Sequence, residues 1–149
     1  MKVQIRKATD TDIPSILRLY AQLEQGGENT LPLLEAAEIF RRIESYPNYH
    51  VYIAEQQGEI LGTFSMAIMD NLAHLGARSG LIEDVVVDEK HRSQGIGKEM
   101  MRYAIDLCRE NACYKASLSS NINREDAHRF YESLGFQIHG FSFQMQLVR

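Results

Sequence analysis

A run of valines at 85–87 that passes through a polar turn into Gly95-Ile96-Gly97 constrains the fold of this chain more than any other stretch. The valines end an apolar strand, and the residues from Gly95 onward begin a helix. A strand that delivers backbone N–H groups to a helix N-terminus makes an anion-binding site, and the positive end of the helix dipole adds to the attraction. The segment therefore predicts a ligand that carries phosphate.

The glycine spacing excludes two common phosphate-binding motifs. A Walker A loop would need Ser or Thr after Gly97-Lys98, where Glu99 stands, and a dinucleotide fingerprint would need a third glycine at Met100. What remains is Arg92-x-x-Gly95-x-Gly97, in which the glycines let the backbone approach a diphosphate and Arg92 adds positive charge. The alternative is an ordinary helix N-terminus, although each glycine there costs about 1 kcal/mol relative to alanine.

The stretch from Arg124 to Phe136 carries a second pattern, Ala127-x-x-x-Tyr131-x-x-x-Gly135-Phe136. Together with the glycine pattern after the apolar strand, it resembles the signature of the GNAT superfamily of N-acetyltransferases. The order of elements, strand–loop–helix and then strand–helix–strand, is also similar to that family. The resemblance covers residues 2 to 148 and is sharpest from Leu81 to Phe136.

The resemblance implies one GNAT-like domain over residues 1–149, of the α/β (or α+β) class. We expect a mixed central sheet of about six to seven strands flanked by about four helices, with two neighbouring strands splayed at a coenzyme A cleft. A chain of 149 residues is about one domain long, and the sequence contains no repeat, low-complexity tract or linker that would divide it.

Periodicity along the chain predicts the individual elements. Strands are expected at residues 3–8, 49–55, 59–69, 81–88 and 114–119, followed by an antiparallel pair at 136–138 and 141–147. Helices are expected from the caps at 9–12 to Gly26-Gly27, from Thr30 to before Pro47, and at 95–110 and 123–134. Gln57-Gly58 is expected to turn a hairpin, and Asn123 to cap the last helix.

By resemblance, acetyl-coenzyme A is the cosubstrate. Its diphosphate would lie on the loop 92–98, and its pantetheine amides would bond to backbone groups that the splayed strands leave unpaired. The residues expected to hold it are Val85, Val86, Val87, Arg92, Ser93, Gln94, Gly95, Ile96, Gly97, Lys98, Asn121, Asn123, Arg124, Ala127, Phe130 and Tyr131. No metal is expected, because no pair of histidines or carboxylates has a ligand-like spacing on one helix.

Two acids interrupt the apolar strand before the glycine loop. Glu83 and Asp84 are costly there unless they are paired or solvated. An acceptor amine of pKa ~10 must lose a proton before it attacks, which costs about 4 kcal/mol at pH 7 without a base. The resemblance places Glu83 beside the amine as that base, with Asp84 second. The alternative is structural ion pairing with Arg78, Arg92 or a helix residue.

Tyr131 is the expected acid. It lies four residues after Ala127, so both face one side of the predicted helix, and the small alanine would let a ligand pass close by. The resemblance implies that the phenol donates a proton to the departing thiolate. The alternative is a core tyrosine that packs beside Phe130 and Phe136.

Arg124 stands where many members of the family carry asparagine, seven residues before the tyrosine. This departure puts the usual side-chain contact to the pantetheine arm in doubt. Asn121 or Asn123 would supply that contact instead, or Arg124 would reach a phosphate or a substrate anion. The alternative is that these residues only cap and turn the chain.

Composition bounds the partners and the location. A net charge of −4 argues against nucleic acid, and no apolar run approaches the ~20 residues that span a membrane. Cys108 and Cys113 lack a zinc spacing and are expected to be reduced thiols, as in an intracellular protein. The chain opens on strand-like residues rather than a leader, so we expect a cytoplasmic location. The resemblance also allows a homodimer.

The resemblance therefore implies that a primary amine attacks the thioester of acetyl-coenzyme A directly, with no acyl-enzyme. The acceptor is a small molecule or a peptide: an amino sugar phosphate, a polyamine, a small amine, an aminoglycoside and a protein N-terminus all remain open. The alternative from another class is a non-catalytic coenzyme A binding or regulatory module. A third interpretation is an acyltransferase for longer acyl chains.

Overall fold

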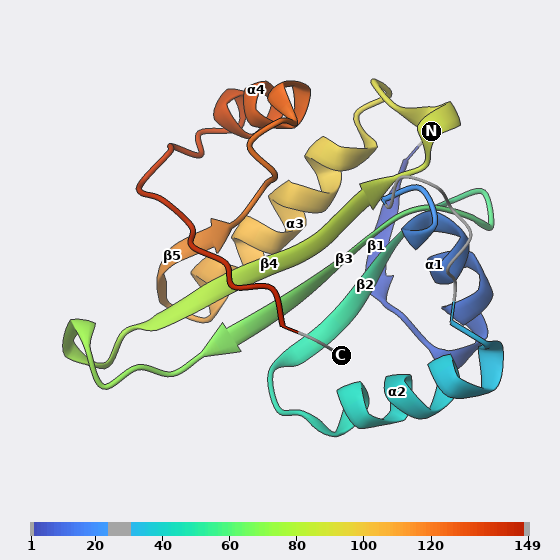
Figure 1. Cartoon of the computed structure of the whole chain (residues 1–149), viewed down its shortest axis with the longest axis horizontal. Helices are drawn as coiled ribbons and strands as arrows, with labels where there is room; N and C mark the ends of the chain where they lie inside the picture. The colour runs from blue at the N-terminus through green and yellow to red at the C-terminus, as the bar shows by residue number, and fades with distance from the viewer. Residues whose placement is uncertain (1, 24–30, 148–149) are drawn as a thin grey trace. The chain divides into compact units, whose positions relative to one another are not determined.

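The computed structural model describes residues 2–23 and 31–147. In these residues it contains a mixed sheet of five strands, together with four α-helices (Figure 1). The backbone groups into two compact units, Met1–Leu118 and Ser119–Arg149. The first unit holds the sheet and three helices, and the second holds the fourth helix. The expected mixed sheet and four helices are confirmed.

The sheet follows the order of the chain. The strands are β1 (Gln4–Lys7), β2 (Tyr49–Gln56), β3 (Glu59–Met69), β4 (Arg78–Val87) and β5 (Cys113–Leu118). The first four pair antiparallel with their neighbours, and β5 pairs with β4 in parallel. Gln57 (φ 53°) and Gly58 (φ 77°) join β2 to β3, both in the left-handed region that a two-residue type I′ hairpin turn requires. The predicted hairpin is confirmed.

The helices are α1 (Ile13–Tyr20), α2 (Leu33–Ser45), α3 (Ile96–Glu110) and α4 (Glu125–Ser133). The predicted end of the first helix at Gly26-Gly27 and the start of the second at Thr30 lie outside the described residues. At the end of α4, Gly135 (φ 100°) forms a Schellman cap in which the Phe136 N–H bonds to the Tyr131 carbonyl at 3.1 Å.

The start of α4 differs from the prediction. The N-cap residue is Arg124, and the prediction of Asn123 is wrong. The reason is a tighter local turn, because the backbone N–H of Asn123 bonds to the Asn121 side-chain oxygen at 2.9 Å.

The two faces of the sheet carry separate parts of the core. On one face α1 and α2 bury Leu19 and Phe40 against Val51 and Ile53. On the other face α3 approaches so closely that a Cβ on Gly62 would lie 2.5 Å from the Met100 sulfur. Glycine at 62 therefore sets the distance between α3 and the sheet.

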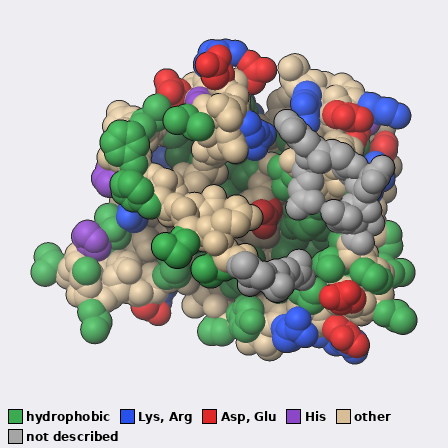
Figure 2. Space-filling view, viewed as in Figure 1, with side chains coloured by type: hydrophobic (Ala, Val, Ile, Leu, Met, Phe, Trp, Pro, Cys, Tyr) green, Lys and Arg blue, Asp and Glu red, His purple; other side chains and the backbone are tan. Residues whose placement is uncertain are grey.

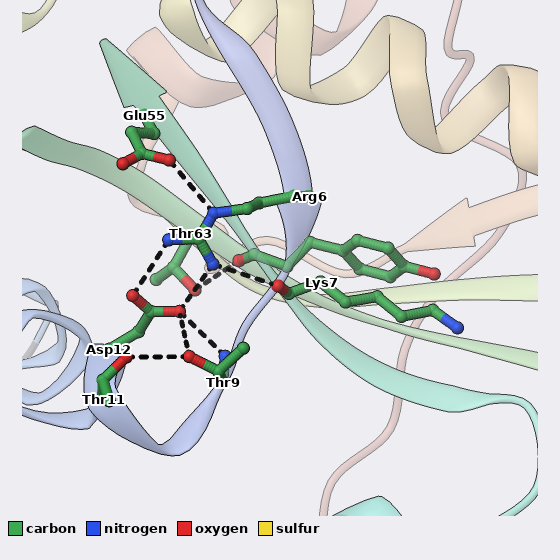
Figure 3. A network of polar contacts seen from close by, with 8 residues as sticks. Arg6, Lys7, Thr9, Thr11, Asp12, Glu55 and Thr63 are labelled. Carbon is green, nitrogen blue, oxygen red and sulfur yellow. Dashed lines mark hydrogen bonds and ion pairs between the residues drawn. The ribbon is translucent and has the colours of Figure 1, made fainter. Parts of the chain in front are cut away.

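An ion-pair network fixes the end of β1 (Figure 3). The Arg6 guanidinium donates to Asp12 at 2.7 Å and to Glu55 at 3.0 Å, and the Asp12 carboxylate also accepts from the Thr9 N–H at 2.8 Å. Asp12 is only 5% exposed. The network joins β1, β2 and the 3₁₀ turn Asp10–Asp12 that leads into α1.

The expected six to seven strands are a correction, because residues 136–138 and 141–147 form no strand. Apart from the half-buried Phe136, their large apolar side chains are exposed: Ile138 (81%), Phe141 (91%), Phe143 (92%), Met145 (81%) and Leu147 (78%). Alternation gives a chain the side-chain pattern of a strand, but a strand also needs a neighbour for its backbone hydrogen bonds. Among the described residues these segments pair with none.

Candidate active site

A β-bulge interrupts β4 at the predicted acids. Ser65 pairs with Glu83 and Thr63 pairs with Val86, so Phe64 alone stands opposite Asp84 and Val85. Asp84 has φ 52°, in the left-handed region that residues other than glycine rarely adopt. Such strain costs on the order of 1–3 kcal/mol and gathers at functional sites. No pattern in the sequence marks this bulge.

Both acids are solvated rather than paired. Glu83 and Asp84 are exposed, and among the described residues neither takes part in an ion pair. Arg78, one of the expected partners, bonds to Asp70 instead, at 3.0 Å. The structural ion pairs expected as the alternative to a catalytic role are therefore not formed within the described part of the chain.

The last turn of α1 faces the bulge. Burial, reinforced by the negative charge of Asp84, raises the pKa of the Tyr20 phenol, while Ser65 and Thr63 on β3 act in the opposite direction. Because Ser65 and Glu83 are cross-strand partners, the Glu83 side chain leaves the sheet on the face that α1 covers. The sequence does not single out Tyr20, since its helical spacing marks it only as part of an apolar face.

One edge of β4 is open beyond the bulge. β5 pairs with β4 only from Arg78↔Cys113 to Ile82↔Leu118, whereas β3 pairs with the other edge as far as Val87. Within the described first unit, residues 83–87 have no strand partner on the β5 side. The backbone groups directed toward this edge can bond to the amides of an extended ligand such as the pantetheine arm of coenzyme A.

The glycine loop follows directly. A 3₁₀ turn, Glu89–His91, leads to Ser93 (φ 62°) and Gly95 (φ 85°), and α3 begins at Ile96. A Cβ on Gly95 would meet nothing within 4 Å, so the described protein requires glycine there for its backbone conformation and not for space.

The loop is open to solvent except at one anchor. Arg92, Ser93, Gln94, Gly95 and Lys98 are exposed, whereas the Ile96 side chain is 2% exposed and belongs to the core. Exposed amides at the N-terminus of a long helix, flanked by two cations, fit a diphosphate. A contact from Ile96 to a cofactor would therefore come from its backbone.

A buried carboxylate braces this loop from below. Asp88, 5% exposed, accepts a hydrogen bond from the Gln22 side-chain amide at 2.9 Å and contacts the His91 ring at 2.6 Å. The bond from Gln22, followed by the one from His91, holds the pKa of Asp88 below its ordinary value. This network was not predicted from the sequence, although an acid directly after three valines is a signal for it.

The second unit carries the other predicted residues, on α4 and the turn before it. The Asn121 carbonyl accepts from the Arg124 N–H at 3.0 Å and contacts the His128 ring at 2.8 Å. These bonds form the turn before α4, and a cofactor contact from Asn121, Asn123 or Arg124 stays a prediction. Ala127 and Phe130 lie on α4, each half-buried.

Tyr131 is buried on α4, at 9% exposure. Its ring lies 5.3 Å from that of Phe130 and 5.9 Å from that of Phe136. Burial raises the pKa of this phenol, while the charge of Arg124 acts in the opposite direction. A phenol that stays protonated at neutral pH suits both a general acid and a core side chain.

The β3–β4 connection lies far from the bulge. It carries the wholly exposed Leu72 and Leu75, and Figure 2 shows hydrophobic side chains at this tip of the sheet, on the left of the view. Asp84 lies six residue steps along β4 from Arg78, roughly 20 Å at ~3.3 Å for each step. The predicted loop at 70–80 therefore stands at the opposite end of β4 from the glycine loop.

Two cavities in the described residues lie elsewhere. One of about 520 Å³ lies between β1 and α3, lined by Lys2, Arg102 and Tyr103 among others. The other, of about 160 Å³, lies between α2 and β2 and is lined by Phe40, Ile43 and His50 among others. Neither includes the bulge or the glycine loop.

The comparisons with known proteins agree with this geometry. The model of the Acetyltransferase (GNAT) family matches residues 13–136. A glucosamine 6-phosphate N-acetyltransferase of Trypanosoma brucei brucei is 30% identical over 97% of this chain and 96% of its own length. An aminoalkylphosphonate N-acetyltransferase of Salmonella typhimurium is 31% identical over 97% of this chain and 91% of its own length.

A solved structure extends the likeness to the fold. The crystal structure of glucosamine-6-phosphate N-acetyltransferase from Arabidopsis thaliana superposes with a TM-score of 0.86 at 26% identity, over 99% of this chain and all of that one. The chain belongs to the GNAT family of acetyltransferases. Its activity is acetyl transfer from acetyl-coenzyme A to an amine.

Proposed function

We propose that the acceptor is a small primary amine that also carries a phosphate or phosphonate group. The names of two end-to-end relatives support this, because glucosamine 6-phosphate and an aminoalkylphosphonate share an amino group and a phosphorus oxyanion. The observation that carries the proposal is the combination of these relatives with a strained, solvated acid on β4 that can receive a cationic amine.

The cosubstrate would lie along β4 and the glycine loop. The backbone of Val85, Val86 and Val87 would bond to the pantetheine amides, and the amides of Arg92–Lys98 would hold the diphosphate. Bound acetyl-coenzyme A supplies an acetyl group that is already activated as a thioester. The chain's part is to orient the amine, hold water away and move two protons.

Glu83 is the proposed base, with Asp84 second. Its carboxylate would take a proton from the ammonium group, so that the nitrogen lone pair can form the new N–C bond. Tyr131 would give its proton to the sulfur as the C–S bond breaks, and the phenolate would then take the extra proton that remains on the amide nitrogen. A positioned acid or base contributes typically 10²–10⁴-fold to such a reaction.

Direct attack agrees with the state of the cysteines. Burial, together with the neighbouring Cys113, raises the pKa of Cys108 to about 12, so this thiol stays protonated. The thiolate, not the thiol, is the nucleophile that an acyl-enzyme would need. Free thiols also support the proposed cytoplasmic location.

A thiol-release assay with an acceptor panel tests the proposal. Glucosamine 6-phosphate and 2-aminoethylphosphonate would be compared with glucosamine and ethylamine, which lack the phosphorus group. We expect kcat/KM for at least one phosphorus-bearing amine to exceed that of its plain counterpart by about 100-fold or more, the size of two to three kcal/mol. Equal values for each pair would contradict the proposed acceptor class.

Substitution of Tyr131 by Phe tests the acid. Tyr131→Phe keeps the contacts with Phe130 and Phe136 and removes only the hydroxyl, so we expect an unchanged melting temperature and kcat lowered by ~10²-fold or more. Glu83→Gln and Asp84→Asn test the base in the same way, since each removes a carboxylate and keeps the size of the side chain. Turnover by Tyr131→Phe at the wild-type rate would leave Tyr131 as a core side chain.

We further propose that the protein is a homodimer that covers the exposed segment 141–147. Phe141, Phe143, Met145 and Leu147 alternate, so one side of this extended segment is apolar and open to solvent. A second copy is the occupant that the chain itself supplies. Light scattering should give twice the mass of one chain, and Phe141→Ser with Phe143→Ser should shift it to one chain. A wild-type protein with the mass of one chain at micromolar concentration would contradict this.

A further inference from the structure

The Gln22 side chain is the least expected contact of the glycine loop. It stands in the turn that ends α1, 66 residues from Asp88 in the sequence. Its amide nitrogen donates to an Asp88 carboxylate oxygen at 2.9 Å, and its amide oxygen accepts from the Glu89 N–H, also at 2.9 Å. Both ends of one side chain therefore bond to two consecutive residues after β4.

The partners fix the orientation of this amide. An ionised carboxylate only accepts and a backbone N–H only donates, so a flipped Gln22 would lose both bonds. The second oxygen of Asp88 contacts the His91 ring at 2.6 Å, and the His91 N–H bonds to the Asp88 carbonyl at 2.9 Å. These bonds hold Asp88, Glu89 and His91 together as one turn, which leads into the loop 92–95.

The position of the turn at residues 88–91 decides where the loop amides point. Its first residue is joined to β3 by a bond from the Asp88 N–H to the Leu61 carbonyl at 2.8 Å. Its far end leads into Ser93 and Gly95, both in the left-handed region. The loop between this turn and α3 is exposed, so its direction is set mainly by its two ends.

We propose that Gln22 is a positioning residue for the loop that binds the coenzyme A diphosphate, acting through Asp88 and Glu89. The inference rests on the proposed placement of the diphosphate on residues 92–98. It assigns to the end of α1 a role in cofactor affinity, next to Tyr20, which faces the bulge from the same turn. Gln22 touches no substrate in this proposal.

The test compares ligands with and without the diphosphate. Gln22→Met keeps the length of the side chain and removes both hydrogen bonds. We expect calorimetry to show coenzyme A binding weakened by about tenfold. We expect kcat/KM for S-acetylpantetheine, which lacks the diphosphate, to stay within about twofold of wild type.

A control and a second readout separate positioning from general damage. Asp106→Asn changes only an exposed pair with Arg109 on α3 and should leave both ligands unaffected. Amide exchange at residues 92–97 should be faster in Gln22→Met than in wild type, without any ligand. If Gln22→Met folds poorly, Gln22→Glu is the second variant. It keeps the oxygen that accepts from the Glu89 N–H and replaces the amide nitrogen with a carboxylate oxygen that faces Asp88. We expect this variant to weaken coenzyme A binding further.

The outcomes distinguish the role of Gln22 from the existence of the diphosphate site. Wild type that binds coenzyme A, with Gln22→Met binding equally well, would overturn the role of Gln22 alone. Equal losses for coenzyme A and S-acetylpantetheine would also overturn it, because the effect would not be specific to the diphosphate. Failure of wild type itself to bind coenzyme A would remove the proposed diphosphate site.

Discussion

At the scale of single residues, two buried carboxylates connect secondary-structure elements of the first unit. Asp12 ties β1 to the turn before α1, and Asp88 ties β4 to α1. Each is 5% exposed, and each has its pKa lowered by hydrogen bonds from its partners. Buried charges of this kind stabilise the fold only while the carboxylates stay ionised.

Acid unfolding should report Asp12. Hydrogen bonding to Arg6 lowers the pKa of Asp12 below its ordinary 3.8, so its contribution is complete above that value and is lost as the pH falls through the folded pKa. We expect Asp12→Asn to lower the free energy of unfolding in urea at pH 7, and the difference from wild type to shrink below about pH 4.

The exposed pair Arg78–Asp70 provides the control. Asp70→Asn should change little at any pH, because exposed ion pairs contribute about 0–1 kcal/mol. A difference between Asp12→Asn and wild type that stays constant from neutral to acid pH would contradict the ionised, Arg6-bonded carboxylate.

Residue roles were only partly accessible to sequence reasoning. Gly95 was found because its spacing from Arg92 and Gly97 is local in the sequence. The expected reason was close approach to a diphosphate, whereas the structure shows a left-handed backbone at this residue. The contact of Gln22 with Asp88 was not found, since it depends on how α1 and β4 pack and no spacing along the chain records it. The strain at Asp84 was missed for the same reason, because a bulge depends on the register of the neighbouring strand.

At the scale of elements, periodicity was the reliable guide. The hairpin of β2 and β3 and the helix α3 were predicted to within a residue or so, because each has a full apolar face and a marked end. The final strands were wrongly predicted from the same signal, since alternation states which side chains share a face and not whether a partner strand exists. The N-cap of α4 failed because the Asn121 turn competes for the Asn123 N–H.

The glycine loop supplies a prediction at this scale. Gly95→Ala places a Cβ on a residue with φ 85°, with no atom within 4 Å to clash, so the cost is conformational, about 1–2 kcal/mol. We expect lower stability together with weaker coenzyme A binding, because relaxation of Gly95 would turn the loop amides.

The matched variant is Gly76→Ala. Gly76 has φ 80° in the β3–β4 connection, and its Cβ would meet only the Asn71 carbonyl at 3.9 Å. It should lose a similar stability and leave coenzyme A binding unchanged. Equal coenzyme A affinity for both variants would show that the conformation of Gly95 does not matter to the ligand.

At the scale of the whole molecule, the two motifs predicted the family because they carry its chemistry in order. The family model and the relatives span both units, from residue 13 to residue 136 and beyond. The sequence did not define the acceptor, because the segments expected to shape its site carry no chemical motif. No helix among the described residues has the length and apolar character needed to cross a bilayer.

The central claim is that the open edge of β4 and the amides of the glycine loop hold coenzyme A. Hydrogen–deuterium exchange of the wild-type protein with and without saturating coenzyme A measures this most directly, since it reports backbone amides. The account predicts slower exchange on binding at residues 83–87 and 92–98. Binding of coenzyme A that leaves exchange at both segments unchanged would contradict it.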